Sequence, residues 1–168
     1  MSYQVSIFLE NKLGHLKKVT AILKAAQINI RSIHLNHTAN GWGILNLVVS
    51  SPQRAQHVLN DNGISAALRE IVVVKMADKP GGLDELLKDV VKAGVNFTNA
   101  HGISVNQGDS AFLVIDVQDI PDARAKLEKV GLEIVADEQV WCAGMTGVSD
   151  FIGPQLFVNQ RSVKTLNE

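Results

Sequence analysis

The residues best suited to binding a small molecule stand at two glycine corners of the sequence. The first corner reads ENKLGHL over residues 10–16, and the second reads DKPGGL over residues 78–83. A glycine loop at a helix start leaves backbone N–H groups without partners at the positive end of the helix dipole. Such a corner favours an anion such as a carboxylate, although a glycine at this place also serves simply to make the turn.

Polar side chains accompany each corner. Asn11 and Asp78 stand just before the glycines, while Asn29 and Asn96 open the strands that follow the helices. Backbone amides for a carboxylate and side-chain oxygens for an ammonium match the head group of a free α-amino acid. We expect the two strand-opening asparagines to lie near their corners, because a βαβ crossover returns the chain beside its first strand.

The two corners belong to a tandem repeat with a shift of 67 residues. Seven identical pairs indicate a duplication rather than chance. They are Lys12 and Lys79, Gly14 and Gly81, Leu16 and Leu83, Ala26 and Ala93, Asn29 and Asn96, His34 and His101, and Gly41 and Gly108. Branched and aromatic runs, helical spacing and turn residues predict the order β-α-β-β-α-β in each copy.

This order predicts an α+β fold of two ferredoxin-like βαββαβ units, with helices on one face of an antiparallel sheet. Residues 64–76 must hold both the last strand of the first copy and the first strand of the second. Strand edges need cover, so we expect side-by-side pairing into an eight-stranded sheet and a homodimer. The predicted domains are residues 1–70 and 71–142, followed by a C-terminal extension over 143–168.

Composition and motifs exclude several function classes. A net charge of −1 and 5% aromatic residues argue against nucleic-acid binding. No apolar run approaches the roughly 20 residues that a bilayer demands, and a single cysteine fits a reducing compartment, so we expect a cytoplasmic protein with no membrane contact. The sequence has no catalytic signature, no phosphate-binding loop and no cysteine or histidine spacing typical of a zinc site. We therefore expect no enzyme activity, no cofactor and no metal.

The histidines and tryptophans leave two interpretations open. His34 and His101 occupy equivalent positions, where they either line a pocket or are strand residues satisfied by backbone or water. His34 and His37 are three apart on a strand and point to opposite faces, which argues against a metal pair. Trp42 and Trp141 are expected to pack at an interface or at the edge of the core.

Both copies resemble ACT domains, in particular the small tandem ACT-domain proteins, over residues 3–142. The family signature is Asp/Asn-x-Pro-Gly-x-Leu, followed about a dozen residues later by Gly-hydrophobic-Asn-hydrophobic. The first copy departs from it at Leu13, which replaces the proline, and at Gln27, which replaces the glycine. The second copy matches it at Asp78, Pro80, Gly81, Leu83, Gly94, Val95, Asn96 and Phe97.

The resemblance implies a regulatory protein that binds an amino acid at an interface between ACT units. In serine-binding ACT domains, the ligand is held by the residue before the glycine corner and by the asparagine opening the second strand. Carried over by position, Asn11 would work with Asn96, and Asp78 with Asn29. An alternative is a detached regulatory subunit of an enzyme of amino-acid metabolism. The implied ligand-binding residues are Asn11, Leu13, Gly14, His15, Leu16, Asn29, Ile30, Asp78, Pro80, Gly81, Gly82, Leu83, Asn96 and Phe97.

The two implied sites are not equivalent. Asp78 offers a formal charge to an ammonium where Asn11 offers a dipole, and His15 in the first copy corresponds to Gly82 in the second. The loss of the proline at Leu13 makes the first corner less pre-ordered, because proline fixes φ in a turn.

Overall fold

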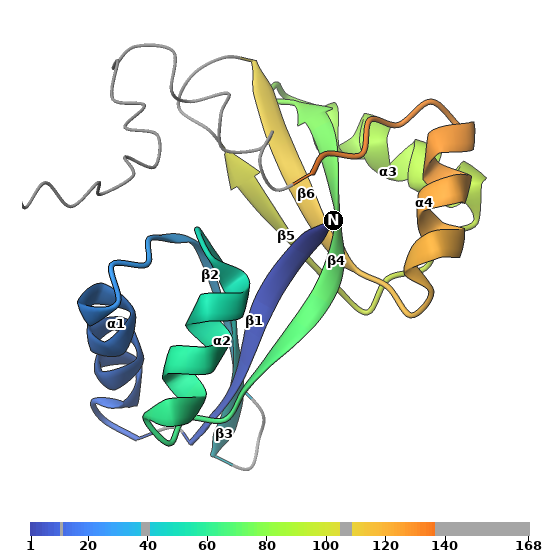
Figure 1. Ribbon diagram of the computed structural model, residues 1–168. Helices are drawn as coiled ribbons and strands as arrows, with labels where there is room; N and C mark the ends of the chain where they lie inside the picture. The colour runs from blue at the N-terminus through green and yellow to red at the C-terminus, as the bar shows by residue number, and fades with distance from the viewer. Residues whose placement is uncertain (11, 38–40, 105–108, 137–168) are drawn as a thin grey trace, which may run out of the picture.

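The computed structural model describes residues 1–10, 12–37, 41–104 and 109–136, which form the strands and helices labelled in Figure 1. In chain order these are β1 Ser2–Glu10, α1 His15–Ala25, β2 Ile30–His37, β3 Trp42–Val49, α2 Pro52–Asp61, β4 Ala66–Ala77, α3 Gly82–Ala93, β5 Asn99–Ser104, β6 Ser110–Asp116 and α4 Ile120–Lys129. The predicted order of strands and helices is confirmed up to the end of α4.

The strands form one antiparallel sheet in the order β2-β3-β1-β4-β6-β5. The central strand β4 is shared by the two copies, because its residues 66–71 pair with β1 and its residues 72–77 pair with β6. In Figure 1, β1 and β4 cross the middle of the molecule with one pair of helices at each end. The predicted domain boundary at residue 70 therefore falls inside a continuous strand.

The described residues thus form six strands rather than the eight expected from two complete units. Two of the eight merge into β4, and among the described residues the last strand of the second copy is represented by a bridge between Val74 and Ile134. The Val135 N–H donates to the Val73 carbonyl at 2.9 Å. Residues 66–71 of β4 pair with β1, and this pairing begins with Ser2 opposite Ile71. Residues 133–135 and β1 therefore lie end to end on the same side of β4.

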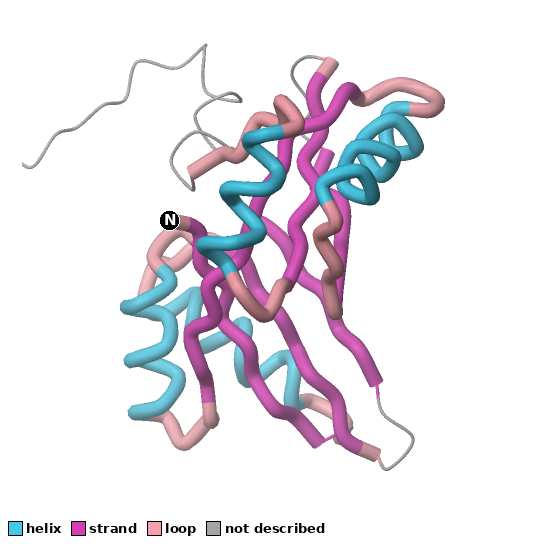
Figure 2. Tube along the Cα trace, turned by 90° about the vertical axis from the view of Figure 1, so that its right-hand side faces the viewer, coloured by secondary structure: helices cyan, strands magenta, loops and turns pink. Residues whose placement is uncertain are grey.

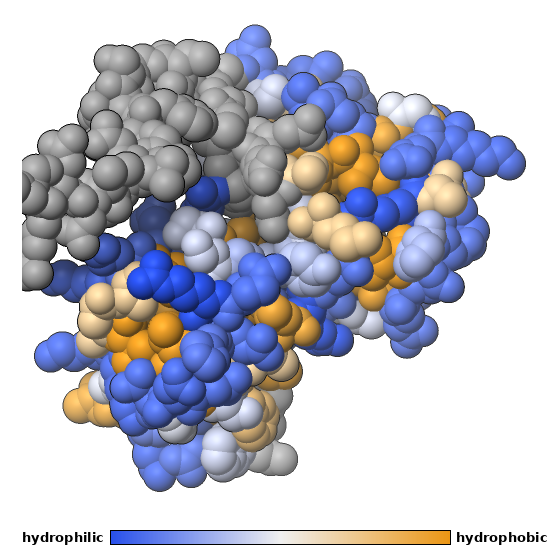
Figure 3. Space-filling model, in the orientation of Figure 1, coloured by the Kyte–Doolittle hydropathy of each residue, from blue (hydrophilic) through white to orange (hydrophobic). Residues whose placement is uncertain are grey.

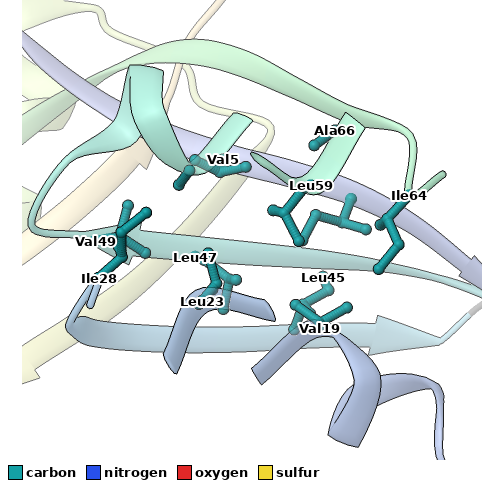
Figure 4. Packing of buried hydrophobic residues seen from close by; sticks show 12 residues of the cluster. Val5, Val19, Leu23, Ile28, Leu45, Leu47, Val49, Leu59, Ile64 and Ala66 are labelled. Atoms are coloured by element: carbon teal, nitrogen blue, oxygen red, sulfur yellow. The ribbon is translucent and has the colours of Figure 1, made fainter. Parts of the chain in front are cut away.

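All four helices pack on the same face of the sheet, as the alternation along β4 shows. Ala66 and Leu68 contact the core beneath α1 and α2, whereas Val72 and Val74 contact the core beneath α3 and α4. Successive side chains of a strand point to opposite faces, so these even-numbered residues share one face. Figure 4 shows the first core, where Val19 and Leu23 of α1 and Leu59 of α2 meet β1 and β3.

The other face of the sheet carries a third cluster of buried residues and has no helix over it in the described part of the chain. The cluster consists of Val48, Ile71, Val73, Ile103, Phe112, Val114 and Val135. It joins β3 of the first copy to β5 and β6 of the second. Strand twist coils the sheet until its two edges approach, since His34 of β2 and His101 of β5 stack with ring centroids 5.5 Å apart. The path of the coiled strands can be followed in Figure 2.

The leucines beside the glycine corners stand outside the core. Leu16 and Leu83 are 39% and 46% exposed, and the first buried apolar side chains of α1 and α3 are Val19 and Leu86. The leucines next to the glycine corners are therefore available at the surface. None of the helices in the described ranges is long and apolar enough to cross a bilayer.

Candidate functional site

The two glycine corners have the same backbone geometry. Gly14 has φ 87° and ψ −9°, and Gly81 has φ 86° and ψ −9°, a left-handed conformation that glycine adopts without strain. The following residue closes each turn: the His15 N–H donates to the Lys12 carbonyl at 3.2 Å, and the Gly82 N–H to the Lys79 carbonyl at 2.9 Å. Neither α1 nor α3 has a side-chain cap at its start, so both corners are suited to an external anion.

The polar residue before each corner is seen only in the second copy, because Asn11 lies outside the described residues. Asp78 is exposed, and its Oδ2 accepts a hydrogen bond of 2.7 Å from the Ser104 hydroxyl at the end of β5. Its backbone N–H donates to the Asp109 carbonyl at 2.8 Å. Through these two hydrogen bonds Asp78 connects the corner to β5 and to the residue before β6.

Gly82 has a structural reason to be glycine. A Cβ at this position would lie 2.1 Å from the backbone carbonyl oxygen of Ala77, so any side chain would force the corner apart. The corresponding His15 is half-buried, and the carbonyl of the residue that matches Ala77, Glu10, instead accepts a hydrogen bond from the Lys12 N–H at 2.8 Å. The close approach of the Ala77 carbonyl therefore explains why the second copy has glycine where the first copy has His15.

The strand-opening asparagines lie away from the corners of their own copies, contrary to the expectation from the sequence. α1 has 11 residues and α3 has 12, so each helix carries the chain roughly 16–18 Å from the corner before the next strand begins. Asn29 is held there by two hydrogen bonds with Ser50. The Asn29 N–H donates to the Ser50 Oγ at 3.1 Å, and the Asn29 carbonyl accepts from the Ser50 N–H at 2.9 Å. The crossover does return the chain to the sheet that contains β1. It arrives, however, at the end of β1 that lies farthest from the glycine corner.

Asn96 and Phe97 line a pocket of about 230 Å³ in the second copy. Its acidic side is the start of α4, where Asp119 Oδ1 accepts from the Asp122 N–H at 3.0 Å. The full lining is Gly94, Val95, Asn96, Phe97, Thr98, Val117, Gln118, Asp119, Asp122 and Ala123. In the first copy Ile30, which corresponds to Phe97, packs against the core.

A second pocket, of about 360 Å³, opens beside the first corner. His15 is the one predicted binding residue in its lining, and the sequence reasoning missed the others. The lining is Phe8, Leu9, Glu10, His15, Lys18, Trp42, Gly63, Ile64 and Ser65, from the end of β1, the start of α1, the start of β3 and the α2–β4 turn. No period in the sequence links these four segments, and only the strand register brings them together.

The two pockets keep the predicted residues apart. The pocket with Asn96 is lined only by residues of the second copy, and the pocket with His15 only by residues of the first. Neither contains Asp78, Asn29 or a corner glycine. A site that joins a corner to an asparagine of the other copy, as predicted, is not assembled around either of these pockets.

The equivalent histidines of the repeat contact each other. The rings of His34 and His101 are stacked with an interplanar angle of 16° and are both half-buried. Burial, followed by the charge of His34, lowers the pKa of His101 below its usual value. The sequence suggested either that these histidines line a pocket or that backbone or water satisfies them. In the structure the two rings contact each other instead.

Comparison with known proteins agrees with this architecture. The family model for an ACT domain pair matches residues 1–142. The crystal structure of protein BT0572 from Bacteroides thetaiotaomicron is similar, with 28% identity, a TM-score of 0.75, and coverage of 83% of this chain and 95% of that chain.

Two less similar structures share the fold. The ligand-free regulatory subunit of aspartate kinase from Thermus thermophilus has 16% identity and a TM-score of 0.56, covering 77% of this chain and 91% of that chain. The corresponding subunit from Thermus flavus has 16% identity and a TM-score of 0.51, covering 76% and 91%. No curated protein sequence matches the chain.

Proposed function

This chain belongs to the family of ACT domain pairs, a regulatory fold, and we propose that it is a non-catalytic cytoplasmic regulator that binds a free amino acid. The observation that carries the proposal is the duplicated corner. Gly14 and Gly81 hold two uncapped helix starts in the same conformation, and each presents backbone amides where a carboxylate can bind. The exposed Leu16 and Leu83 stand beside them for contact with a ligand side chain.

The ligand is proposed to bind between ACT units, with Asp78 opposite Asn29 and Asn11 opposite Asn96. Within each copy, the length of the helix separates the glycine corner from the asparagine. Each proposed pair therefore combines the corner of one unit with the asparagine of another. A homodimer would supply such pairs of surfaces from its second chain.

The test is a thermal-shift screen of the full chain against the twenty amino acids, followed by calorimetry on each hit. A ligand at a hundredfold excess over its Kd is expected to stabilise the protein by roughly 2.7 kcal/mol. Asp78→Asn keeps an acceptor for Ser104 while removing the charge, and Asn96→Ala removes the amide; both should weaken binding at least tenfold. Asp89→Asn, farther along α3, is the matched control. Absence of a shift with all twenty would reject the proposal.

The homodimer has its own test, which concerns the C-terminal extension. Residues 143–168 lie outside the described residues, and the sequence makes them a candidate for reaching across to a partner chain. Deletion of residues 144–168 is expected to convert a dimer to a monomer in light scattering. A full chain that is monomeric, or an unchanged mass after deletion, would contradict this.

A second candidate function is a detached regulatory subunit of an enzyme of amino-acid metabolism. The favouring observation is that the aspartate kinase regulatory subunit from Thermus thermophilus is matched over 91% of its length, so that subunit is itself little more than this fold. Purification of the tagged full chain from its own cells would bring down a catalytic chain in this case. That enzyme's response to an amino acid should then depend on added regulator.

A further inference from the structure

The face of the sheet opposite the helices carries an exposed apolar surface in the first copy. Successive side chains of a strand point to opposite faces, and Ile7 of β1 and Leu45 of β3 lie in the core beneath α1 and α2. Phe8, Trp42 and Ile44 therefore point to the face without helices. Phe8 lies opposite Ile44 in the strand register, and its ring stacks on Trp42 with centroids 4.7 Å apart. We call these three residues the aromatic patch.

The aromatic patch is accessible and lies close to the first glycine corner. Phe8 is 56% exposed, Ile44 39% and Trp42 37%. Single apolar residues at a surface are common, but contiguous exposed apolar side chains are typical of interaction sites. Glu10 lies opposite Trp42 and stands four positions before Gly14. A chain that covers the patch therefore stands beside the first corner.

The fold does not require this patch, because the second copy builds the same strands without it. At the repeat shift of 67 residues, Phe8 corresponds to Lys75. In the register of β4 with β6, the other two patch residues correspond to Phe112, which is buried, and Ser110. The second copy thus places a charge and a hydroxyl where the first copy exposes aromatic rings. The patch is a property of the surface rather than of the fold.

The described chain ends on this same face of the sheet. Val135 belongs to the third cluster of buried residues, and the described residues stop at residue 136. The sequence beyond it contains an apolar segment, FIGPQLFV, over residues 151–158. The fifteen residues from 136 to 151 span roughly 50 Å when extended. The distance along β4 from Val73, beside Val135, to Ala66, next to the patch, is about 24 Å. The segment is therefore long enough to reach an aromatic patch.

A second copy of the chain supplies this segment most directly. His101 lies opposite Val114 of the third cluster, so its ring is on this face and stacks there on His34. A segment of the same chain would have to pass round this contact to reach the patch. The proposed ligand site at the first corner also lies between units, and a partner chain on the patch brings a second unit to that corner. In a symmetric dimer, each chain gives its segment to the other.

The groove between α1 and α2, where Figure 3 shows hydrophobic residues at the surface, is less suited to this segment. Ile22, Ala25 and Val58 are among its lining residues, and the lining holds no aromatic side chain. The groove also lies on the helix side of the sheet, away from the face on which Val135 is buried.

We propose that the aromatic patch binds the apolar segment 151–158 of a second copy of this chain. The apolar side chains of the segment cover Phe8 and Ile44, and the exchange is reciprocal about the two-fold axis of the dimer. The inference rests on the homodimer of the proposed function, and it assigns the surface that receives the C-terminal extension.

The first experiment cross-links single cysteines in full-length chains that also carry Cys142→Ser, which removes the only native cysteine. A chain with Ile44→Cys is co-expressed with a differently tagged chain with Phe157→Cys, and a short bismaleimide should join them into a heterodimer identified by mass. Val91→Cys, 77% exposed on α3, replaces Ile44→Cys as the matched control and should give at least tenfold less product. Absence of the heterodimer would overturn the proposal, and an internal link in a chain with both cysteines would then assign the segment to its own chain.

The second experiment measures the dimer dissociation constant by sedimentation equilibrium. Phe8→Lys installs the residue of the second copy and should raise the constant at least tenfold, whereas Val91→Lys, at an exposed apolar position outside the patch, should change it less than twofold. Phe157→Ser should act like Phe8→Lys, and the double variant should add little, because both changes remove the same contact. Thermal melting checks that each variant is folded, and Phe157→Ser decides the matter if Phe8→Lys unfolds.

The outcomes separate this inference from the proposed function. A dimer that withstands both Phe8→Lys and Phe157→Ser would overturn the patch as the receiving surface and leave the proposed homodimer in place. A monomeric full chain would reject the homodimer and this inference together. Binding of a free amino acid is tested separately by the thermal-shift screen.

Discussion

The two copies of the repeat agree in what the fold needs and differ in what faces solvent. The buried helix positions Val19 and Leu23 of the first copy correspond to Leu86 and Val90 of the second, all apolar. The corner glycines have φ angles within one degree of each other. The exposed positions around the corners differ in size, charge and aromaticity. Duplication therefore preserved the scaffold, while the surface beside each corner became different.

The largest expected effect tests whether Gly82 is a packing residue. Gly82→Ala places a Cβ 2.1 Å from the Ala77 carbonyl oxygen and should lower the free energy of unfolding by about 1–3 kcal/mol. The reverse change in the first copy, His15→Gly, should cost less than about 1 kcal/mol, because a glycine in a helix loses mainly backbone entropy. Urea denaturation measures both. Equal losses would mean that the corners pack alike and that the side chain at this position serves another purpose.

The next effect tests the likeness of the corners. Gly14→Ala and Gly81→Ala each force a side chain into the left-handed region and should each cost about 1–2 kcal/mol of unfolding free energy. Apart from the adjacent residues of the chain, no described atom lies within 4 Å of either added Cβ, so the cost is expected to come from backbone strain. Losses that differ by more than about 1 kcal/mol between the copies would contradict the common geometry, since the two φ angles are the same.

The smallest effect concerns the contact between the copies at His34 and His101. The pKa of His101 is lowered in the folded protein, so the unfolded chain binds this proton more readily. Stability is therefore complete above the ordinary value of 6.5 and falls as the pH is lowered through it. His101→Gln should remove this fall, and His34→Gln should reduce it, because the charge of His34 is the lesser cause. Chemical denaturation at pH 7.5 and pH 5.5 gives the comparison, and an unchanged pH dependence in His101→Gln would contradict it.

Local patterns predicted most of the fold because the duplication repeats every local signal. The glycine corners, Pro52 in the first turn of α2 and Gly63 just after its end are local features that act over one turn of chain. The positive φ angles of Gly14, Gly81 and Gly63 follow from residue type. The fusion of two strands into β4 was also foreseen in the shared segment 64–76. The described residues hold six strands rather than eight, because two strands merge into β4 and the last strand of the second copy is described only as far as residue 136, where Ile134 bridges Val74.

The candidate sites were predicted less completely, because they depend on which distant segments meet. The sequence pointed to Asn29 and Asn96 as neighbours of their corners, but the length of α1 and α3 places them at the far end of each unit. Phe8 and Trp42 are 34 positions apart, and only the antiparallel pairing of β1 with β3 brings their rings together. The His34–His101 contact likewise requires the sheet to coil.

The sequence by itself determined that this protein is a duplicated α+β chain with a left-handed glycine before one helix of each copy, since these features depend on local backbone preferences and on periodicity. The tertiary structure alone decided which exposed side chains share a pocket, because strand register and sheet twist set distances between residues that no local preference connects. The same glycine corner therefore stands beside a pocket whose lining includes His15, Lys18 and Ile64 in the first copy, whereas His15 and Lys18 correspond to Gly82 and Glu85 in the second.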